Sequence, residues 1–140
     1  MNATMGAHRA DRATQVAGSM SLAAEVRAKC FALVGDAVDV LVSCHAAHKG
    51  YLSGYFSIVH DLNPRYLSAV VATRDRVALV VSASDAGPAL EETGDPAALF
   101  RYGFFCFEQV DGTGADGYDA AGFASFDEAL LAGVEERKGC

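Results

Sequence analysis

Cysteine and histidine side chains come together once in this sequence, just after the apolar run that begins at Val38. Cys44, His45 and His48 form a Cys-His-x-x-His spacing, which can place two metal-ligand types on one face of a turn. A structural zinc site needs four ligands, and the sequence offers no third and fourth partner nearby. We therefore expect surface histidines at a strand end and no metal site in this chain.

A glycine-rich motif, GTGADG from Gly112 to Gly117, has the G-x-G-x-x-G spacing of dinucleotide-binding loops. No strand–turn–helix unit frames it, and the carboxylates of Asp111 and Asp116 would repel a pyrophosphate. The segment Asp111–Gly122 is therefore expected to be a solvated loop. The sequence also lacks a G-x-S-x-G elbow and places no base beside a cysteine, so no catalytic residue is predicted.

The segment after Gly54 combines aromatic and polar side chains: Tyr55, Phe56, His60, Asp61 and Arg65. An arginine can hold a carboxylate through two parallel hydrogen bonds, and a histidine can change its charge near neutral pH. One interpretation is that these residues face a ligand or a partner. The other is that the aromatic rings cap the sheet edge and that Arg65 pairs with Asp61. The local pattern leaves both open.

The composition is that of a folded, acidic domain. Among 140 residues, 51% are hydrophobic and 21% are charged, with a formal net charge of −7. The 11 basic residues are scattered, whereas phosphate backbones are bound by clustered ones, so nucleic acid is not an expected partner. No apolar run approaches the roughly 20 residues that span a bilayer, and no signal peptide is evident. We expect a cytoplasmic protein without membrane contact and without a cofactor in this chain.

Local signals predict the elements that position these residues. Residues 1–20 lack periodicity and are expected to be a flexible arm, and residues 21–140 to form one domain. A helix is predicted to begin near Ser21 and to end at Gly35. Its apolar face is expected to consist of Leu22, Val26, Cys30, Leu33 and Val34.

The middle of the chain predicts a short helix between buried strands. Val38–Ser43 is rich in β-branched residues and is expected to be a central buried strand. A short helix follows at Ala46–Leu52, which Gly54 ends. The runs Tyr66–Ala72 and Val77–Val81 are expected to form an antiparallel hairpin, and their unbroken apolar character indicates a sheet covered on both faces.

Towards the C-terminus, the sequence predicts a short helix at Ala89–Thr93, with Pro88 near its start, and a buried strand at Phe104–Phe107. Ser125 and Glu128 have the spacing of a capping box, which marks the start of a last helix. The order of elements predicts an α/β fold, a mixed sheet with helices on both faces.

This succession resembles the N-terminal domain of the creatinase/prolidase/aminopeptidase P family, over roughly Leu22 to Val134. The resemblance rests on a helix, a strand of the type DVLVS, and a Y-L-[ST]-G-aromatic motif, here Tyr51-Leu52-Ser53-Gly54-Tyr55. It implies a ribonuclease H-like mixed sheet, with Tyr51 and Gly54 in structural roles. Full-length members add a C-terminal "pita-bread" domain that holds a divalent metal pair, and none of those ligands maps onto this chain.

The resemblance thus implies the non-catalytic N-terminal domain of a hydrolase, foremost a Xaa-Pro peptidase. Alternatives are a creatinase-like amidinohydrolase domain and a free-standing interaction domain with no hydrolase role. Domains of this family contact neighbouring subunits, so a homodimer or domain–domain contacts are expected. The loop Tyr55–Arg65 is then expected to be exposed and mobile in the isolated domain and to help shape a neighbouring active site.

Overall fold

The computed structural model describes residues 3–103 and 122–139, except for the side chains of residues 3–13 and 16. The described elements, in chain order, are α1 (Ala3–Val34), η1 (Gly35–Ala37), β1 (Leu41–Ser43), α2 (Ala46–Ser53), α3 (Ile58–Leu62), β2 (Ala69–Ala72), β3 (Val77–Ser82), α4 (Ala83–Thr93), η2 (Pro96–Ala98), β4 (Leu99–Tyr102) and α5 (Phe126–Lys138). The strands lie in the order β1-β2-β3-β4. The first two pairings are antiparallel and β3–β4 is parallel.

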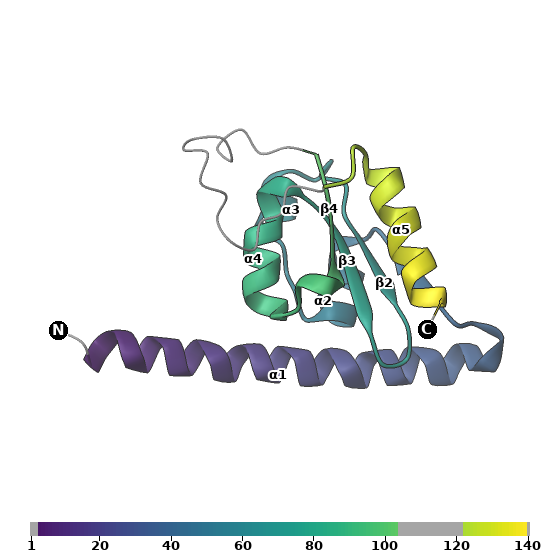
Figure 1. The fold of residues 1–140 in the computed structure, drawn as a ribbon. Coiled ribbons are helices and arrows are strands. Elements are labelled where there is room, and N and C mark those ends of the chain that lie inside the picture. The colour runs from purple at the N-terminus through teal and green to yellow at the C-terminus, as the bar shows by residue number, and fades with distance from the viewer. Residues whose placement is uncertain (1–2, 104–121, 140) are drawn as a thin grey trace.

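The described part of the chain is therefore an α/β fold with a mixed, four-stranded sheet, as the sequence predicts. Residues of β2 and the centre of β3 are buried on both faces. One face packs against α2, α4 and α1, through a cluster that includes Leu52, Ala86 and Val26. The other face packs against α5 through Ala129 and its neighbours. Figure 1 shows α5 alone on its side of the strands. The ribonuclease H-like subtype stays a prediction.

The first helix begins at Ala3 and not near Ser21, so that prediction was wrong. Residues 3–20 are rich in alanine and other good helix formers, which sustain a helix without an apolar stripe. Figure 1 shows the N-terminal turns of α1 running past the rest of the fold. Whether these turns are flexible in solution stays a prediction. Gly35, with φ +70°, follows the last residue of α1, as expected.

The buried face of α1 also differs from the predicted stripe. Leu22 and Leu33 are 55% and 88% exposed, whereas Ala23, Arg27 and Phe31 are buried. Residues four apart share a helix face, so both sets have helical spacing. The contacts with α2 and α4 select the face that is buried, and a charged residue, Arg27, belongs to it.

Strand β1 lies at the edge of the sheet, so its prediction as a central buried strand was wrong. It spans Leu41–Ser43 and pairs with β2 alone among the described strands. Val42 is 47% exposed. The apolar residues before Leu41 find no backbone partner in β2, because the pairing stops where Ala72 ends that strand.

Two predictions are confirmed: β2 and β3 form an antiparallel hairpin, and Gly54 ends α2. The backbone N–H of Thr73 donates to the carbonyl of Arg76 across the turn. Gly54 follows α2 with φ +82°, and its N–H closes the helix on the carbonyl of Gly50. A Cβ at position 54 would lie 3.2 Å from the backbone of Ser19, so both conformation and space favour glycine there.

Helix α4 begins at Ala83, six residues earlier than predicted, and Pro88 lies inside it. A proline in a helix interior removes one hydrogen bond and costs roughly 3 kcal/mol. The burial of Ala86 and Ala89 against the sheet, and the hydrogen bonds of Asp85, offset that cost. Tertiary packing therefore overrides the local signal that placed Pro88 near the start of a helix.

The C-terminal region confirms the last helix and adds a strand. Ser125 caps α5 by accepting a hydrogen bond from the N–H of Glu128, whose carboxylate accepts in turn from the N–H of Ala124. Strand β4, Leu99–Tyr102, was not predicted. The strand predicted at 104–107 lies outside the described residues. So does the glycine motif at 112–117, and of the loop predicted at 111–122 only residue 122 is described.

Candidate functional site

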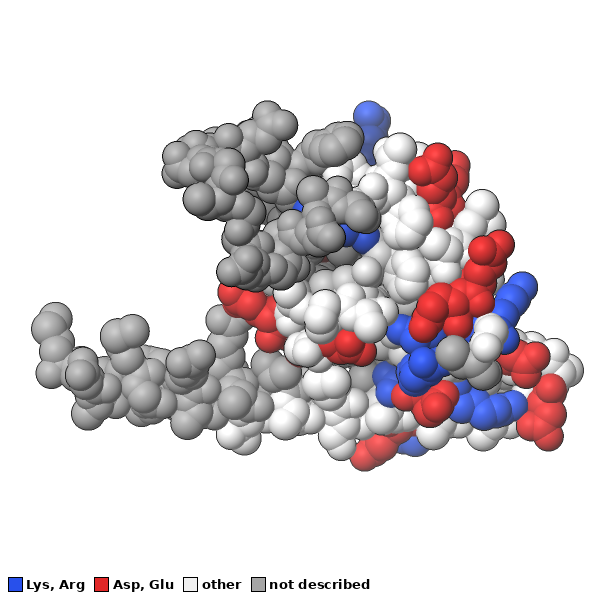
Figure 2. Space-filling view, viewed as in Figure 1, with Lys and Arg blue, Asp and Glu red and all other residues white. Residues whose placement is uncertain are grey.

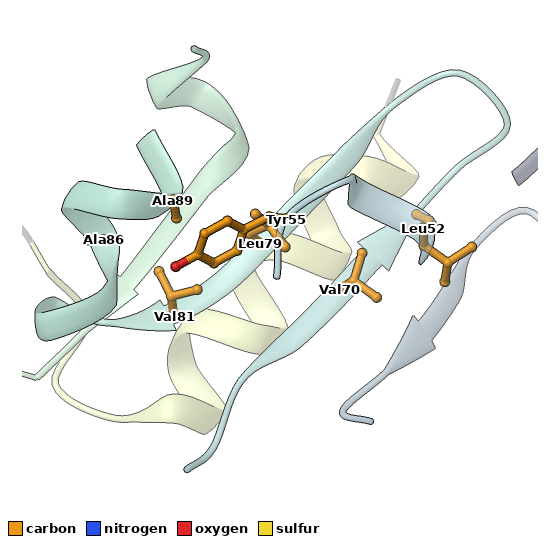
Figure 3. Packing of buried hydrophobic residues seen from close by; sticks show 8 residues of the cluster. Leu52, Tyr55, Val70, Leu79, Val81, Ala86 and Ala89 are labelled. Atoms are coloured by element: carbon orange, nitrogen blue, oxygen red, sulfur yellow. The ribbon is translucent and has the colours of Figure 1, made fainter. Parts of the chain in front are cut away.

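Tyr55, predicted to face a ligand or a partner, lies in the protein core. Its side chain is 2% exposed, and Figure 3 shows its ring between α4, at Ala86 and Ala89, and the strand residues Leu79 and Val81. The phenol donates a hydrogen bond of 2.5 Å to Oδ1 of Asp85. Tyr55 therefore holds the segment after Gly54 against the sheet.

Asp85 is the centre of a buried polar cluster that joins segments far apart in the sequence. This carboxylate is 0% exposed and lies in the first turn of α4, where the helix dipole favours negative charge. Its Oδ2 accepts hydrogen bonds from Ser57 Oγ at 2.6 Å and from the Tyr66 phenol at 3.1 Å. Together with Tyr55, these donors clamp the segment that contains α3 at both of its ends.

The environment of this cluster shifts the pKa of its tyrosines. Burial raises the pKa of Tyr55, and the hydrogen bond to Asp85 raises it further. Burial also raises the pKa of Tyr66, although the hydrogen bond from the Ser82 N–H lowers it in part. Both phenols are therefore neutral hydrogen-bond donors throughout the physiological range, which suits a structural role.

Lys49 and Ser68 form a second buried pair. The Lys49 ammonium donates a hydrogen bond of 2.6 Å to Ser68 Oγ and lies 5.4 Å from the centre of the Tyr66 ring. Burial lowers the pKa of Lys49, and the charges of Asp85 and Asp61 raise it. A serine beside such a lysine is the arrangement of an activated nucleophile. Both residues are only 1% exposed, and neither lines any of the cavities described here, so this pair is interpreted as structural.

Large apolar side chains remain exposed on the outer side of this clamped segment. Phe56 and Ile58 are 60% and 64% exposed, Leu62 in α3 is 80% exposed, and Tyr51 in α2 is 54% exposed. The Phe56 ring meets Tyr51 edge-on, with centroids 6.1 Å apart, and covers Gly50, where a Cβ would overlap it. We call these four side chains, Tyr51, Phe56, Ile58 and Leu62, the α2–α3 surface.

His60, Asp61 and Arg65 do not form a common site. Asp61 and Arg65 are exposed and take part in none of the ion pairs found among the described residues, so the pairing that one of the two interpretations assumed is absent. The His60 ring lies 6.1 Å from Tyr66, and its Nδ1 is buried without a partner in the described part of the chain. Of the five residues predicted to face a ligand or a partner, only Phe56 belongs to the α2–α3 surface; Tyr51, for which the resemblance implied a structural role, belongs to it as well and is 54% exposed.

The cysteine and histidine cluster at the start of α2 serves local structure. His45 caps the helix by accepting a hydrogen bond from the Ala47 N–H, and His48 Nδ1 lies 3.0 Å from Ser43 Oγ. Among the residues whose side chains the structure describes, no three His, Cys, Asp or Glu side chains are grouped to hold a metal ion. Cys44 is an exposed free thiol.

The sequence did not reveal the residues that organise this region, namely Asp85, Lys49, Ser57, Ser68 and Tyr66. Asp85 follows the apolar run of β3 closely, and a carboxylate there is the one local hint. Its donors lie 19 to 30 residues away in the sequence. A pattern search over neighbouring residues cannot detect partners at that separation.

Comparisons of the chain with protein-family models, with curated proteins and with solved structures gave no match. Among the described helices, none is long and apolar enough to cross a membrane.

Proposed function

We propose that this chain is a non-catalytic α/β domain of a hydrolase that provides a surface for contact with a second subunit. The parent enzyme we favour is a Xaa-Pro peptidase of the creatinase/prolidase/aminopeptidase P family. The order of elements supports this relationship: a long helix, a strand, the Tyr51–Tyr55 motif at the end of a short helix, and a β-hairpin. The left-handed glycine within that motif supports it as well.

The observation that carries the contact function is the α2–α3 surface. Four large apolar side chains there are each more than half exposed, and patches of this kind mark interaction sites. Aromatic anchors such as Tyr51 and Phe56 contribute much of the binding energy at interfaces. The buried cluster around Asp85 holds the segment beneath them in place, which lowers the entropy lost on binding.

Sedimentation velocity of the purified chain, over about 5 to 200 μM, tests this function. We expect a dimer that Phe56→Ser and Leu62→Ser each weaken by at least about tenfold in Kd, or about 1.4 kcal/mol. Leu131→Ser is the matched control, because Leu131 is 63% exposed on α5, on the other face of the sheet. A wild-type chain that stays monomeric, or an equal loss in the control, would contradict a contact through this surface.

A further inference from the structure

The hydrogen bonds of the β2–β3 hairpin fix the direction in which each residue of β2 turns its backbone groups. The Thr73 N–H donates to the Arg76 carbonyl, so these two residues form a hydrogen-bonded pair. Hydrogen-bonded and non-hydrogen-bonded pairs alternate along an antiparallel ladder. Ala72, one residue before Thr73, therefore turns its N–H and C=O away from β3 and towards β1, and so does Val70.

Strand β1 consequently presents backbone hydrogen-bonding groups at the open edge of the sheet. Leu41 and Ser43 lie opposite Ala72 and Val70 and direct their backbone groups to β2. Val42 lies between them, so its N–H and C=O point outwards, and they have no backbone partner among the described residues. Natural edge strands block pairing with proline or a charged side chain, and Leu41–Ser43 contains neither. This edge is therefore able to accept another strand.

An apolar groove lies beside the same strand, on the side where α1 and α2 pack. Its volume is about 380 Å³, and its wall includes Val26 of α1, Leu41 and Ser43 of β1, and His48, Tyr51 and Leu52 of α2. None of the described residues in this wall is Asp, Glu, Lys or Arg. Figure 2 shows such side chains gathered instead where α1 passes the end of α5. An uncharged surface favours association between copies of a chain whose net charge of −7 makes them repel each other.

We propose that a second copy of this chain pairs with β1 in antiparallel orientation, about a two-fold axis at Val42, and continues the sheet from one copy into the other. This inference rests on the contact function proposed above and specifies how the second subunit docks. The two-fold axis places Leu41 of each copy opposite Ser43 of the other. Both residues line the groove, so Leu41 of each copy covers the groove of its partner.

The charges that flank β1 favour this orientation over parallel pairing. Asp39 precedes the strand and His45 follows it, each three residues from Val42. The antiparallel arrangement brings Asp39 of one copy towards His45 of the other, whereas a parallel arrangement would bring the two Asp39 carboxylates together. The contact is also continuous with the α2–α3 surface, because Tyr51 belongs both to that surface and to the groove wall.

Hydrogen–deuterium exchange of the full chain at about 200 μM, followed for single amides by NMR, tests the strand pairing directly. The amides of Leu41 and Ser43 are bonded to β2 in monomer and dimer alike, so they are internal controls. We expect the Val42 amide to be protected to a similar extent. In a monomer this amide points into solvent and would exchange at least about tenfold faster than its two neighbours.

Val42→Lys tests the same contact by sedimentation velocity. We expect Kd of the dimer to rise by at least about tenfold and the protection of the residue-42 amide to be lost, because like charges then meet at the two-fold axis. Val42→Thr is the matched control: it keeps the β-branched shape without a charge and should dimerise as the wild type does.

The outcomes separate this pairing from the contact through the α2–α3 surface. A dimer that Val42→Lys dissociates, but that Phe56→Ser and Leu62→Ser leave intact, would support the edge pairing and contradict the contact through that surface. An unprotected Val42 amide, or a Val42→Lys dimer as tight as that of the wild type, would overturn the edge pairing, even if Phe56→Ser weakens the dimer. A wild-type chain that stays monomeric would overturn both.

Discussion

Replacement of Asp85 by alanine tests whether the buried cluster holds the fold together. The carboxylate is 0% exposed and accepts three hydrogen bonds, at 2.5, 2.6 and 3.1 Å, from Tyr55, Ser57 and Tyr66. Alanine leaves three buried hydroxyl donors without their acceptor, at a cost of roughly 1–3 kcal/mol each. Removal of the buried charge recovers part of its desolvation cost. We expect the free energy of unfolding to fall by about 3–5 kcal/mol.

That loss is a large fraction of the roughly 5–15 kcal/mol that stabilises a domain of this size. Urea unfolding followed by far-ultraviolet circular dichroism measures it, since the chain contains no tryptophan. Asp85→Asn keeps the shape and one acceptor oxygen, so it should cost less, about 1–2 kcal/mol. The double-mutant cycle of Asp85→Ala with Tyr55→Phe should give a coupling energy of roughly 1.5–3 kcal/mol. A fall in the free energy of unfolding of less than about 1 kcal/mol for Asp85→Ala would refute the inference that this cluster holds the fold together.

Three further outcomes are expected. Burial raises the pKa of Tyr55 and Tyr66 above the ordinary value of about 10, so the unfolded chain loses these protons at a lower pH than the folded chain does. The free energy of unfolding should therefore fall above about pH 10, by up to roughly 1.4 kcal/mol per pH unit for each phenol. Urea melts between about pH 8 and 11.5 measure this slope, and a flat profile would contradict it. Gly54→Ala should lower the Tm of the chain by more than Gly94→Ala does. Both glycines have positive φ, but only at Gly54 would a Cβ meet the backbone of Ser19. Equal losses of Tm would exclude that contact as a cause. With Mn²⁺ or Zn²⁺, the chain alone should not turn over Xaa-Pro dipeptides or creatine, and turnover abolished by a substitution in this chain would contradict that.

The sequence predicted those features that neighbouring residues specify. Gly54 ends α2 because only glycine adopts φ +82° without steric cost, and Ser125 starts α5 through a side chain that reaches a backbone N–H three residues on. The Thr73–Arg76 turn likewise sets the β2–β3 hairpin. Each of these signals acts within about four residues, so a single local pattern is sufficient.

Tertiary structure alone decided the edge position of β1, the path of α4 through Pro88 and the buried face of α1. Each depends on which surface another element covers, and burial against the sheet outweighs a local cost of roughly 3 kcal/mol at a proline. The same holds for the polar clusters: Asp85 meets Tyr55 across 30 residues, and Lys49 meets Ser68 across 19. A buried charge is tolerated only where the folded chain supplies its partners, and these partners become neighbours only on folding.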